Sequence, residues 1–191
     1  MTLGVTAQGT LKAALSKIQS QSKYDTLVYF GADFSQVRIN DTPKISRSVR
    51  YSEVYPAAWI SFINEQLPPD LYVRNVLKFR NFQNAQKEIF NKSIKVSPAF
   101  ITGYDREIPS DSIDLVVSGY VLQSKSGLGL VLIPESFSKP GENATTWVVF
   151  FDVRTRHVIY KTKVFGRCSH MGYTAHWASG VVNGFKHFAR H

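Results

Sequence analysis

The chain has 191 residues, of which 43% are hydrophobic and 19% charged, a composition typical of one folded domain rather than of a disordered chain. No apolar run approaches the ~20 residues that cross a bilayer, so the sequence predicts no transmembrane segment. Lys and Arg number 23 against 14 Asp and Glu, which gives a net charge of +9 and favours anionic partners.

The N-terminal residues have two interpretations. The run LGVTAQ, residues 3–8, contains the small-residue pattern Val5-Thr6-Ala7, which is typical of the cleavage site of a secretory signal peptide. On that interpretation residues 1–9 are a signal-peptide remnant, and the protein is periplasmic or secreted. A frayed terminus explains the same residues. On both interpretations we predict a single domain over residues 10–191.

The first part of this domain predicts a helix followed by strands. Residues 10–23 place apolar side chains on one helical face behind Thr10, which is a suitable N-cap. The run 26–34 is rich in β-formers and predicts a strand. The run 35–41 predicts a second strand or a continuation of the first.

Two further helices are predicted before the middle of the chain. Ser52 is a suitable cap for a helix over residues 53–66, which a double proline ends. The run 71–92 has apolar residues in mostly helical spacing, and it predicts a second helix with a break near Asn81.

Four runs in the second half are rich in branched and aromatic side chains and predict strands. They cover residues 113–123, 127–137, 145–155 and 157–165. Short connections join them, which predicts antiparallel neighbours. The third run is apolar on both faces until Asp152, which predicts a central strand that is covered on both sides.

From Tyr173 to Arg190 the spacing becomes helical, with Trp177 on an apolar arc. Gly180 and Gly184 predict a close approach of this helix to another backbone. The elements together predict an α+β fold, in which a mostly antiparallel or mixed sheet of about five strands carries packed helices, including the C-terminal amphipathic helix.

The stretch GRCSHMGYTAHW, residues 166–177, places the single cysteine, Cys168, near His170, Met171 and His176. Thiolate, imidazole and thioether groups are ligands for zinc or copper. A structural zinc site usually needs four ligands, and the pattern Cys-x-His-x5-His completes no recognised set. We therefore predict neither a metal nor a cofactor.

A cysteine-dependent hydrolase is an alternative, with Cys168 as the nucleophile and His170 or His176 as its base. The flanking residues match no hydrolase signature, and a lone cysteine is commonly a small packed residue. The sequence therefore favours a structural connection between a strand and a helix. Asp33 and Ser35, which end the first predicted strand, similarly favour a turn bonded to its own backbone.

Two dense basic stretches are the candidate binding residues. They are Arg38, Lys44, Arg47 and Arg50 in the first stretch, and Arg74, Lys78 and Arg80 in the second. Aromatic residues lie among them, and this combination binds nucleic acid when the charges meet phosphates and the rings stack on bases. Because no recognition motif is present, this alternative is limited to weak nonspecific binding, and no specific nucleic-acid partner is predicted.

One segment resembles a known group of proteins. The run VVFFDVRTRHVIYKTKVFG, residues 148–166, with the loop and helix after it, resembles the closing segment of bacterial envelope proteins related to the curli-assembly lipoprotein and to the N-terminal domain of TolB. The matching positions are Asp152, Thr155, Val158 and Gly166, whereas Arg156 and His157 replace a glycine and a polar residue. The resemblance covers about the last third of the chain. It implies an α/β sandwich and an envelope setting, and it transfers no catalytic residue.

These observations predict an exported, noncatalytic α+β domain that binds an unknown envelope protein or an anionic surface through its basic residues. The hydrolase that uses Cys168 and the weak nonspecific nucleic-acid binder remain the alternatives.

Overall fold

The structure is a computed structural model that describes residues 11–19, 24–40, 48–96, 101–102, 104–105, 107–169 and 172–190. In chain order the elements are α1 (Leu11–Gln19), β1 (Thr26–Ala32), β2 (Arg38–Asn40), α2 (Ser48–Gln66), the π-helical turn η1 (Pro69–Val73), α3 (Arg74–Leu77), β3 (Asn81–Asn84), α4 (Gln86–Ser93), β4 (Ile101–Thr102), α5 (Ser110–Ser118), β5 (Leu128–Ser138), β6 (Asn143–Asp152), β7 (Val158–Arg167) and α6 (Tyr173–Arg190). Residues 1–9 and the predicted Thr10 cap lie outside the described residues. No described helix is long and apolar enough to cross a membrane.

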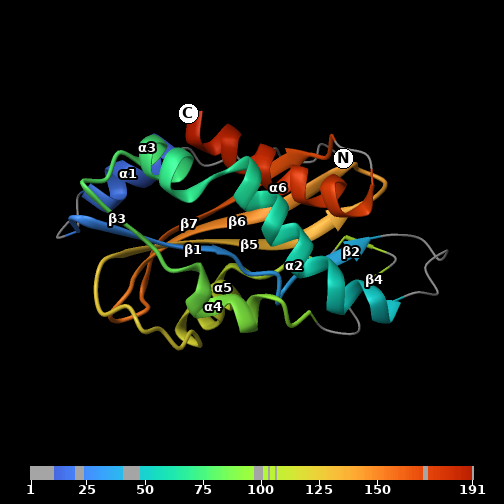
Figure 1. Ribbon diagram of the computed structural model, residues 1–191, viewed down its shortest axis with the longest axis horizontal. Coiled ribbons are helices and arrows are strands. Elements are labelled where there is room, and N and C mark those ends of the chain that lie inside the picture. The colour runs from blue at the N-terminus through green and yellow to red at the C-terminus, as the bar shows by residue number, and fades with distance from the viewer. Residues whose placement is uncertain are drawn as a thin grey trace.

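Seven strands of the described chain form one mixed sheet around β5. On one edge of β5, β1 runs parallel to its first half and β2 runs parallel to its second half. On the other edge, β6 and then β7 run antiparallel. Because β1 and β2 lie end to end along β5, their outer neighbours β3 and β4 lie at opposite ends of the sheet (Figure 1).

Helices cover both faces of the sheet (Figure 1). One face packs against α1, α2, α3 and α6, and the other packs against α4 and α5. On the first face, the Phe137 ring stacks on the Trp177 ring, with ring centroids 5.3 Å apart. It also makes an edge-to-face contact with the Trp59 ring, whose centroid is 5.2 Å away. On the second face, Phe151 contacts the rings of Phe30 and Tyr120. The prediction of a central strand covered on both sides is confirmed by β6.

A β-bulge in β5 places a buried carboxylate in the sheet. The register with β6 shifts between Pro134 and Ser136, so Glu135 is the extra residue. Its Oε1 accepts hydrogen bonds from Lys163 Nζ at 3.0 Å and the Ile108 amide at 3.0 Å, and its Oε2 accepts one from Trp147 Nε1 at 2.6 Å. Because both oxygens are satisfied within the fold, this cluster is structural.

Three glycines bring α6 into backbone contact with β7. A β-carbon on Gly166 would overlap the carbonyl oxygen of Gly180 and the amide nitrogen of Gly184. A β-carbon on Gly180 would lie 2.7 Å from Ala144 Cβ. The predicted close approach at Gly180 and Gly184 is therefore confirmed, and Gly166 is its counterpart on the strand.

Two predicted elements are wrong. The run 113–123 was predicted as a strand, but α5 covers Ser110–Ser118 and the rest of the run is irregular. Ile113 and Val117, four residues apart, are buried on one side of this helix. The run 71–92 was predicted as a helix with a break near Asn81, but η1, α3, the edge strand β3 and α4 divide it.

Most of the remaining predictions are confirmed in type. α2 begins at Ser48, before the predicted Ser52 cap, and it accommodates Pro56 within the helix. The predicted helix 10–23 is α1, the predicted strands 26–34 and 35–41 contain β1 and β2, and α6 has the predicted bounds. The last three predicted strands are β5, β6 and β7, and they pair antiparallel as expected.

Candidate binding surface

The Cys168 thiol is enclosed where β7 leads towards α6. Its side chain is 5% exposed, and its amide donates a hydrogen bond of 2.8 Å to the Glu142 carbonyl. A β-carbon on Gly180 would lie 2.9 Å from its sulfur, so the thiol packs directly against α6. Burial raises the pKa of Cys168 to about 12, which keeps the thiol protonated at neutral pH and opposes a nucleophilic role.

The other residues of the stretch do not assemble a site in the described structure. His170 and Met171 lie outside the described residues. His176 is half-buried in α6, and its ring makes an edge-to-face contact with the Trp177 ring, with ring centroids 4.7 Å apart. Among the residues that the structure describes, no group of three or more His, Cys, Asp or Glu side chains could hold a metal ion.

The two basic stretches lie apart. Arg38 begins β2, beside Ser136 at the C-terminal half of β5, and its Nη1 donates a 2.8 Å hydrogen bond to the Val37 carbonyl. Lys44 and Arg47 lie outside the described residues, and Arg50 belongs to the first turns of α2.

The second stretch lies at the other end of the sheet (Figure 1). Arg74, Lys78 and Arg80 are exposed on α3 and on the connection to β3. Because β3 and β2 lie at opposite ends, the fold does not join Arg38 with these three residues in one patch.

A groove of about 520 Å³ lies at the end of the molecule that carries α3. We call it the α1–α3–α6 groove, after the elements that form it. Its lining residues are Leu11, Lys12, Leu15, Ser16, Val76, Lys78, Ala189 and Arg190. Figure 1 shows α1, α3 and the C-terminal end of α6 side by side on the same face of the sheet. Of the predicted basic residues whose side chains the structure describes, Lys78 alone lines it.

The rim of the groove is cationic. Lys12, Lys78 and Arg190 are exposed, and none of the described lining residues is acidic. Among the described residues, none of these three cations forms an ion pair. No described carboxylate therefore pairs with them, and their positive potential favours an anion at the groove.

The sequence did not single out Lys12 or Arg190 as binding residues. Lys12 belongs to a surface helix and Arg190 to the polar side of another, positions at which a basic residue needs no special role. They come together because the apolar face of α1 and the end of α6 pack on the same core. The signal that could have indicated Lys12 is its position beside Leu11 and one helical turn before Leu15.

Lys78 occupies an unusual backbone conformation at the groove. It ends α3 with φ 53° and ψ 33°, and its amide donates a 3.0 Å hydrogen bond to the Arg74 carbonyl. Helices commonly use glycine at such a position, because a side chain there costs about 1–2 kcal/mol. The following residue, Phe79, packs on the core. The left-handed cap therefore separates the partly buried ring of Phe79 from the exposed ammonium group of Lys78 at the groove.

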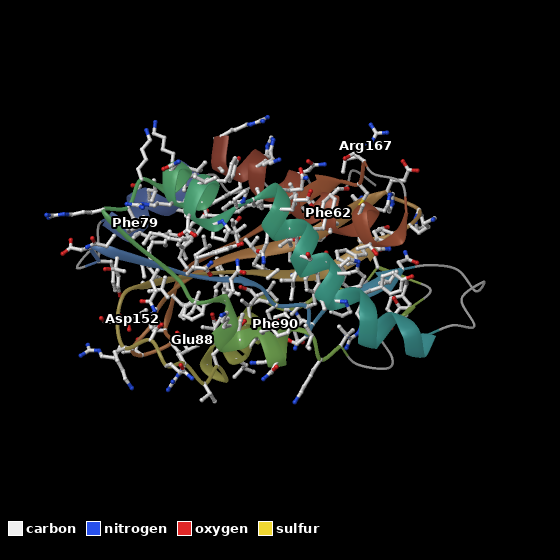
Figure 2. All side chains as sticks on the ribbon, in the orientation of Figure 1. Phe62, Phe79, Glu88, Phe90, Asp152 and Arg167 are labelled. Carbon is white, nitrogen blue, oxygen red and sulfur yellow. The ribbon has the colours of Figure 1, made fainter. Side chains whose placement is uncertain are left out.

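A second cavity, of about 470 Å³, is polar and lies where β6 ends. There the Tyr24 hydroxyl donates a 2.6 Å hydrogen bond to Asp152 Oδ2, while Asp152 Oδ1 accepts one from the Thr155 amide at 2.7 Å and one from the Thr155 hydroxyl at 2.9 Å. Figure 2 shows Asp152 at the opposite end of the sheet from Arg167. The Asp-x-x-Thr motif of the predicted resemblance thus has a structural role in the β6–β7 turn.

Asp33 also has a structural role. Its Oδ1 accepts a 2.9 Å hydrogen bond from the Ser35 amide, which confirms the predicted turn, and its Oδ2 accepts a 2.8 Å hydrogen bond from the Tyr120 hydroxyl. Burial raises the pKa of Tyr120, and the neighbouring Asp33 adds to the effect, so the phenol stays neutral and remains a donor. The fully buried carboxylate is therefore held by partners within the fold.

No family model matches the chain, and the curated proteins and the solved structures include no significant match. The candidate surface is therefore defined by its own geometry and charge.

Proposed function

We propose that this chain is an exported, noncatalytic domain that binds an anionic component of the cell envelope in the α1–α3–α6 groove. The observation that carries the proposal is the groove itself, in which three exposed cations, Lys12, Lys78 and Arg190, lie with apolar residues that form its floor, Leu11, Leu15, Val76 and Ala189. None of the three cations pairs with a carboxylate among the described residues. Such a surface attracts an anionic partner and gives it apolar contacts once bound. A noncatalytic role is supported by the enclosed Cys168 thiol, whose pKa burial raises to about 12.

Export is supported by two features of the sequence. They are the signal-peptide pattern in LGVTAQ and the resemblance of residues 148–166 to envelope proteins. Fractionation of native cells should place the mature protein in the periplasm or outside the cell, with an N-terminus near Ala7 or Gln8. Retention of an unprocessed chain in the cytoplasm would contradict export.

Binding of nucleic acid is less well supported. A nonspecific binder needs a continuous basic track along which the phosphates lie. Arg38 lies at one end of the sheet, whereas Arg74, Lys78 and Arg80 lie at the other. The described basic side chains thus favour a local anionic site.

A photo-crosslinking experiment tests the proposed site in cells. Benzoylphenylalanine replaces Ser16, which lines the groove, or Ser118, which is exposed at the end of α5 on the other face. We expect an adduct with an envelope component from position 16 and not from position 118. The adduct should disappear in the Lys78→Gln/Arg190→Gln variant. Equal adducts from both positions, or an adduct that is insensitive to the two charges, would contradict the proposal.

A further inference from the structure

The lining of the α1–α3–α6 groove divides into an apolar part and a cationic part. The apolar side chains are those of Leu11, Leu15, Val76 and Ala189, and the cationic ones are those of Lys12, Lys78 and Arg190. A free inorganic anion would contact only the cationic side chains, and a neutral apolar ligand would contact only the apolar side chains, which form the floor of the groove. A ligand that uses both has a hydrocarbon chain next to an anionic group.

We infer that the groove binds one single-chain anionic amphiphile, with the chain on the apolar floor and a phosphate or carboxylate head at Lys78 and Arg190. This inference rests on the proposed function and names its ligand class. The groove volume of about 520 Å³ falls within the range of roughly 300–1,000 Å³ that is typical of small-molecule sites. A volume of this size accommodates one small ligand.

The ends of three elements fix the position of the head group. Lys78 follows the last turn of α3 and Arg190 ends α6, while Lys12 lies in the first turn of α1. The left-handed backbone at Lys78, with φ 53°, sets the direction in which its side chain leaves the helix. Because none of the described residues that line the groove is acidic, a bound phosphate would meet the cations without a competing carboxylate from these residues.

Calorimetric titration of the full chain with dodecyl phosphate, below its micelle concentration, tests the inference. Two matched probes accompany it: dodecyl maltoside, which has the same chain and a neutral head, and inorganic phosphate, which has the head and no chain. We expect one-to-one binding of dodecyl phosphate. Dodecyl maltoside should bind about tenfold or more weakly, because it loses the charge-assisted contacts. Inorganic phosphate should bind at least a hundredfold more weakly, since each buried methylene contributes about fourfold in affinity.

Variants locate the binding. Lys78→Gln/Arg190→Gln should weaken dodecyl phosphate binding by about tenfold or more. Lys87→Gln/Lys125→Gln removes the same charge from exposed positions on α4 and on the α5–β5 connection, and it should leave the affinity unchanged. Val76→Thr places a hydroxyl on the floor with little change of shape and should weaken dodecyl phosphate more than inorganic phosphate. These charge changes involve exposed side chains, so folding should be preserved.

The outcomes separate this inference from the proposed function. Equal affinity for dodecyl phosphate and inorganic phosphate, or for dodecyl phosphate and dodecyl maltoside, would overturn the amphiphile. Binding to phosphatidylglycerol vesicles without binding of monomeric dodecyl phosphate would also overturn the amphiphile. It would show that the groove binds a membrane surface instead. If the probe fails while the charge-dependent adduct from position 16 persists, the proposed function stands and the ligand class is wrong. If both fail, both are wrong.

Discussion

Both carboxylate oxygens of Asp152 accept hydrogen bonds at the turn between β6 and β7. Burial raises the pKa of this carboxyl, but the donors Tyr24 and Thr155, with the charge of Arg154, outweigh burial and bring the pKa below its usual value. The same contact works in the opposite direction on the phenol, because burial and Asp152 raise the pKa of Tyr24 to about 12. The turn is therefore most stable when the carboxyl is ionised.

Replacement of Asp152 by Asn should produce a pH-dependent loss of stability. A carboxyl with a depressed folded pKa contributes stability above its unfolded pKa of about 3.9, and this contribution is lost as the pH falls through the folded pKa. The variant should be less stable than the parent near pH 7, and the difference should shrink below about pH 4. Urea unfolding near pH 7 and below about pH 4 measures the difference in unfolding free energy between variant and parent. Asp25→Asn, at an exposed position, is the control. An equal difference at both pH values would show that ionisation is irrelevant.

Cys168 should react with thiol reagents only when the chain unfolds. Its pKa of about 12 lowers the thiolate fraction at neutral pH by more than about a hundredfold relative to a free thiol. A chromogenic disulfide should therefore label the native protein slowly and the denatured protein rapidly. Cys168→Ser should keep the affinity of the groove. Rapid native labelling, together with a hydrolytic activity that Cys168→Ser abolishes, would support the hydrolase alternative.

Lys78 gives a test in which stability and binding change in opposite directions. Glycine tolerates its left-handed backbone, so Lys78→Gly should leave stability unchanged or raise it by up to about 1 kcal/mol. The same change removes a cation from the groove and should weaken dodecyl phosphate binding by about tenfold. Thermal unfolding and calorimetry on the same sample measure both quantities. A variant that loses stability and keeps its affinity would assign Lys78 a structural role.

The packing of α6 on the β6–β7 hairpin depends on the glycines at which the helix crosses β7. Gly166 in β7 faces Gly180 and Gly184 in α6, where a β-carbon would meet backbone atoms that cannot rotate away. Trp177, one turn before Gly180, anchors the same helix against Phe137 at 5.3 Å. The shape of the helix–sheet contact, rather than hydrophobicity alone, therefore fixes the position of α6 and of the groove at its C-terminal end.

We expect Gly166→Ala to destabilise the domain by about 3 kcal/mol, because overpacking against backbone forces the helix away from the strand. Gly119→Ala is the matched control, since its nearest neighbour, the Leu115 carbonyl oxygen, lies 3.4 Å from the added carbon. Chemical denaturation of both variants makes the comparison. Equal stability of the two variants would show that α6 does not need this close approach.

The wrong element predictions have a common physical cause, which is that tertiary packing decides the type of short segments. The run 113–117 is rich in β-branched residues, which favour a strand. Ile113 and Val117, one helical turn apart, nevertheless both pack into the core beneath α4 and α5, so the segment is helical. The edge strand β3, Asn81–Asn84, has Phe82 as its one apolar residue, which is too little alternation to predict a strand, and it forms because it pairs with β1. The long apolar strands and α6 are predictable from the sequence because burial and local propensity agree there.

Only part of the candidate surface was predictable for the same reason. Lys78 belongs to a visible basic stretch, whereas Lys12 and Arg190 reach the groove only because α1 and α6 share a core. Conversely, Arg38 belongs to a basic stretch but lies at the other end of the sheet. Charge density along the sequence thus identifies candidate residues, and the fold decides which of them act together.

At the scale of the whole molecule, the net charge is +9, and the described residues of the two basic stretches do not share one face. Arg38 and the group formed by Arg74, Lys78 and Arg80 occupy opposite ends of an elongated sheet (Figure 1). Anion binding at the groove should weaken with salt as expected for a small number of exposed charges. We therefore expect the ligand to bind locally, at the end formed by α1, α3 and α6.

Chemical-shift mapping of backbone amides during titration of the full chain with dodecyl phosphate shows where the ligand binds. We expect the largest changes at five residues that line the groove, which are Leu11, Leu15, Val76, Lys78 and Ala189. Amides around the polar cavity at Tyr24 and Asp152, and those beside Arg38, should stay unchanged. Changes centred on either of those regions, or an absence of saturable changes at the groove, would contradict binding at the groove.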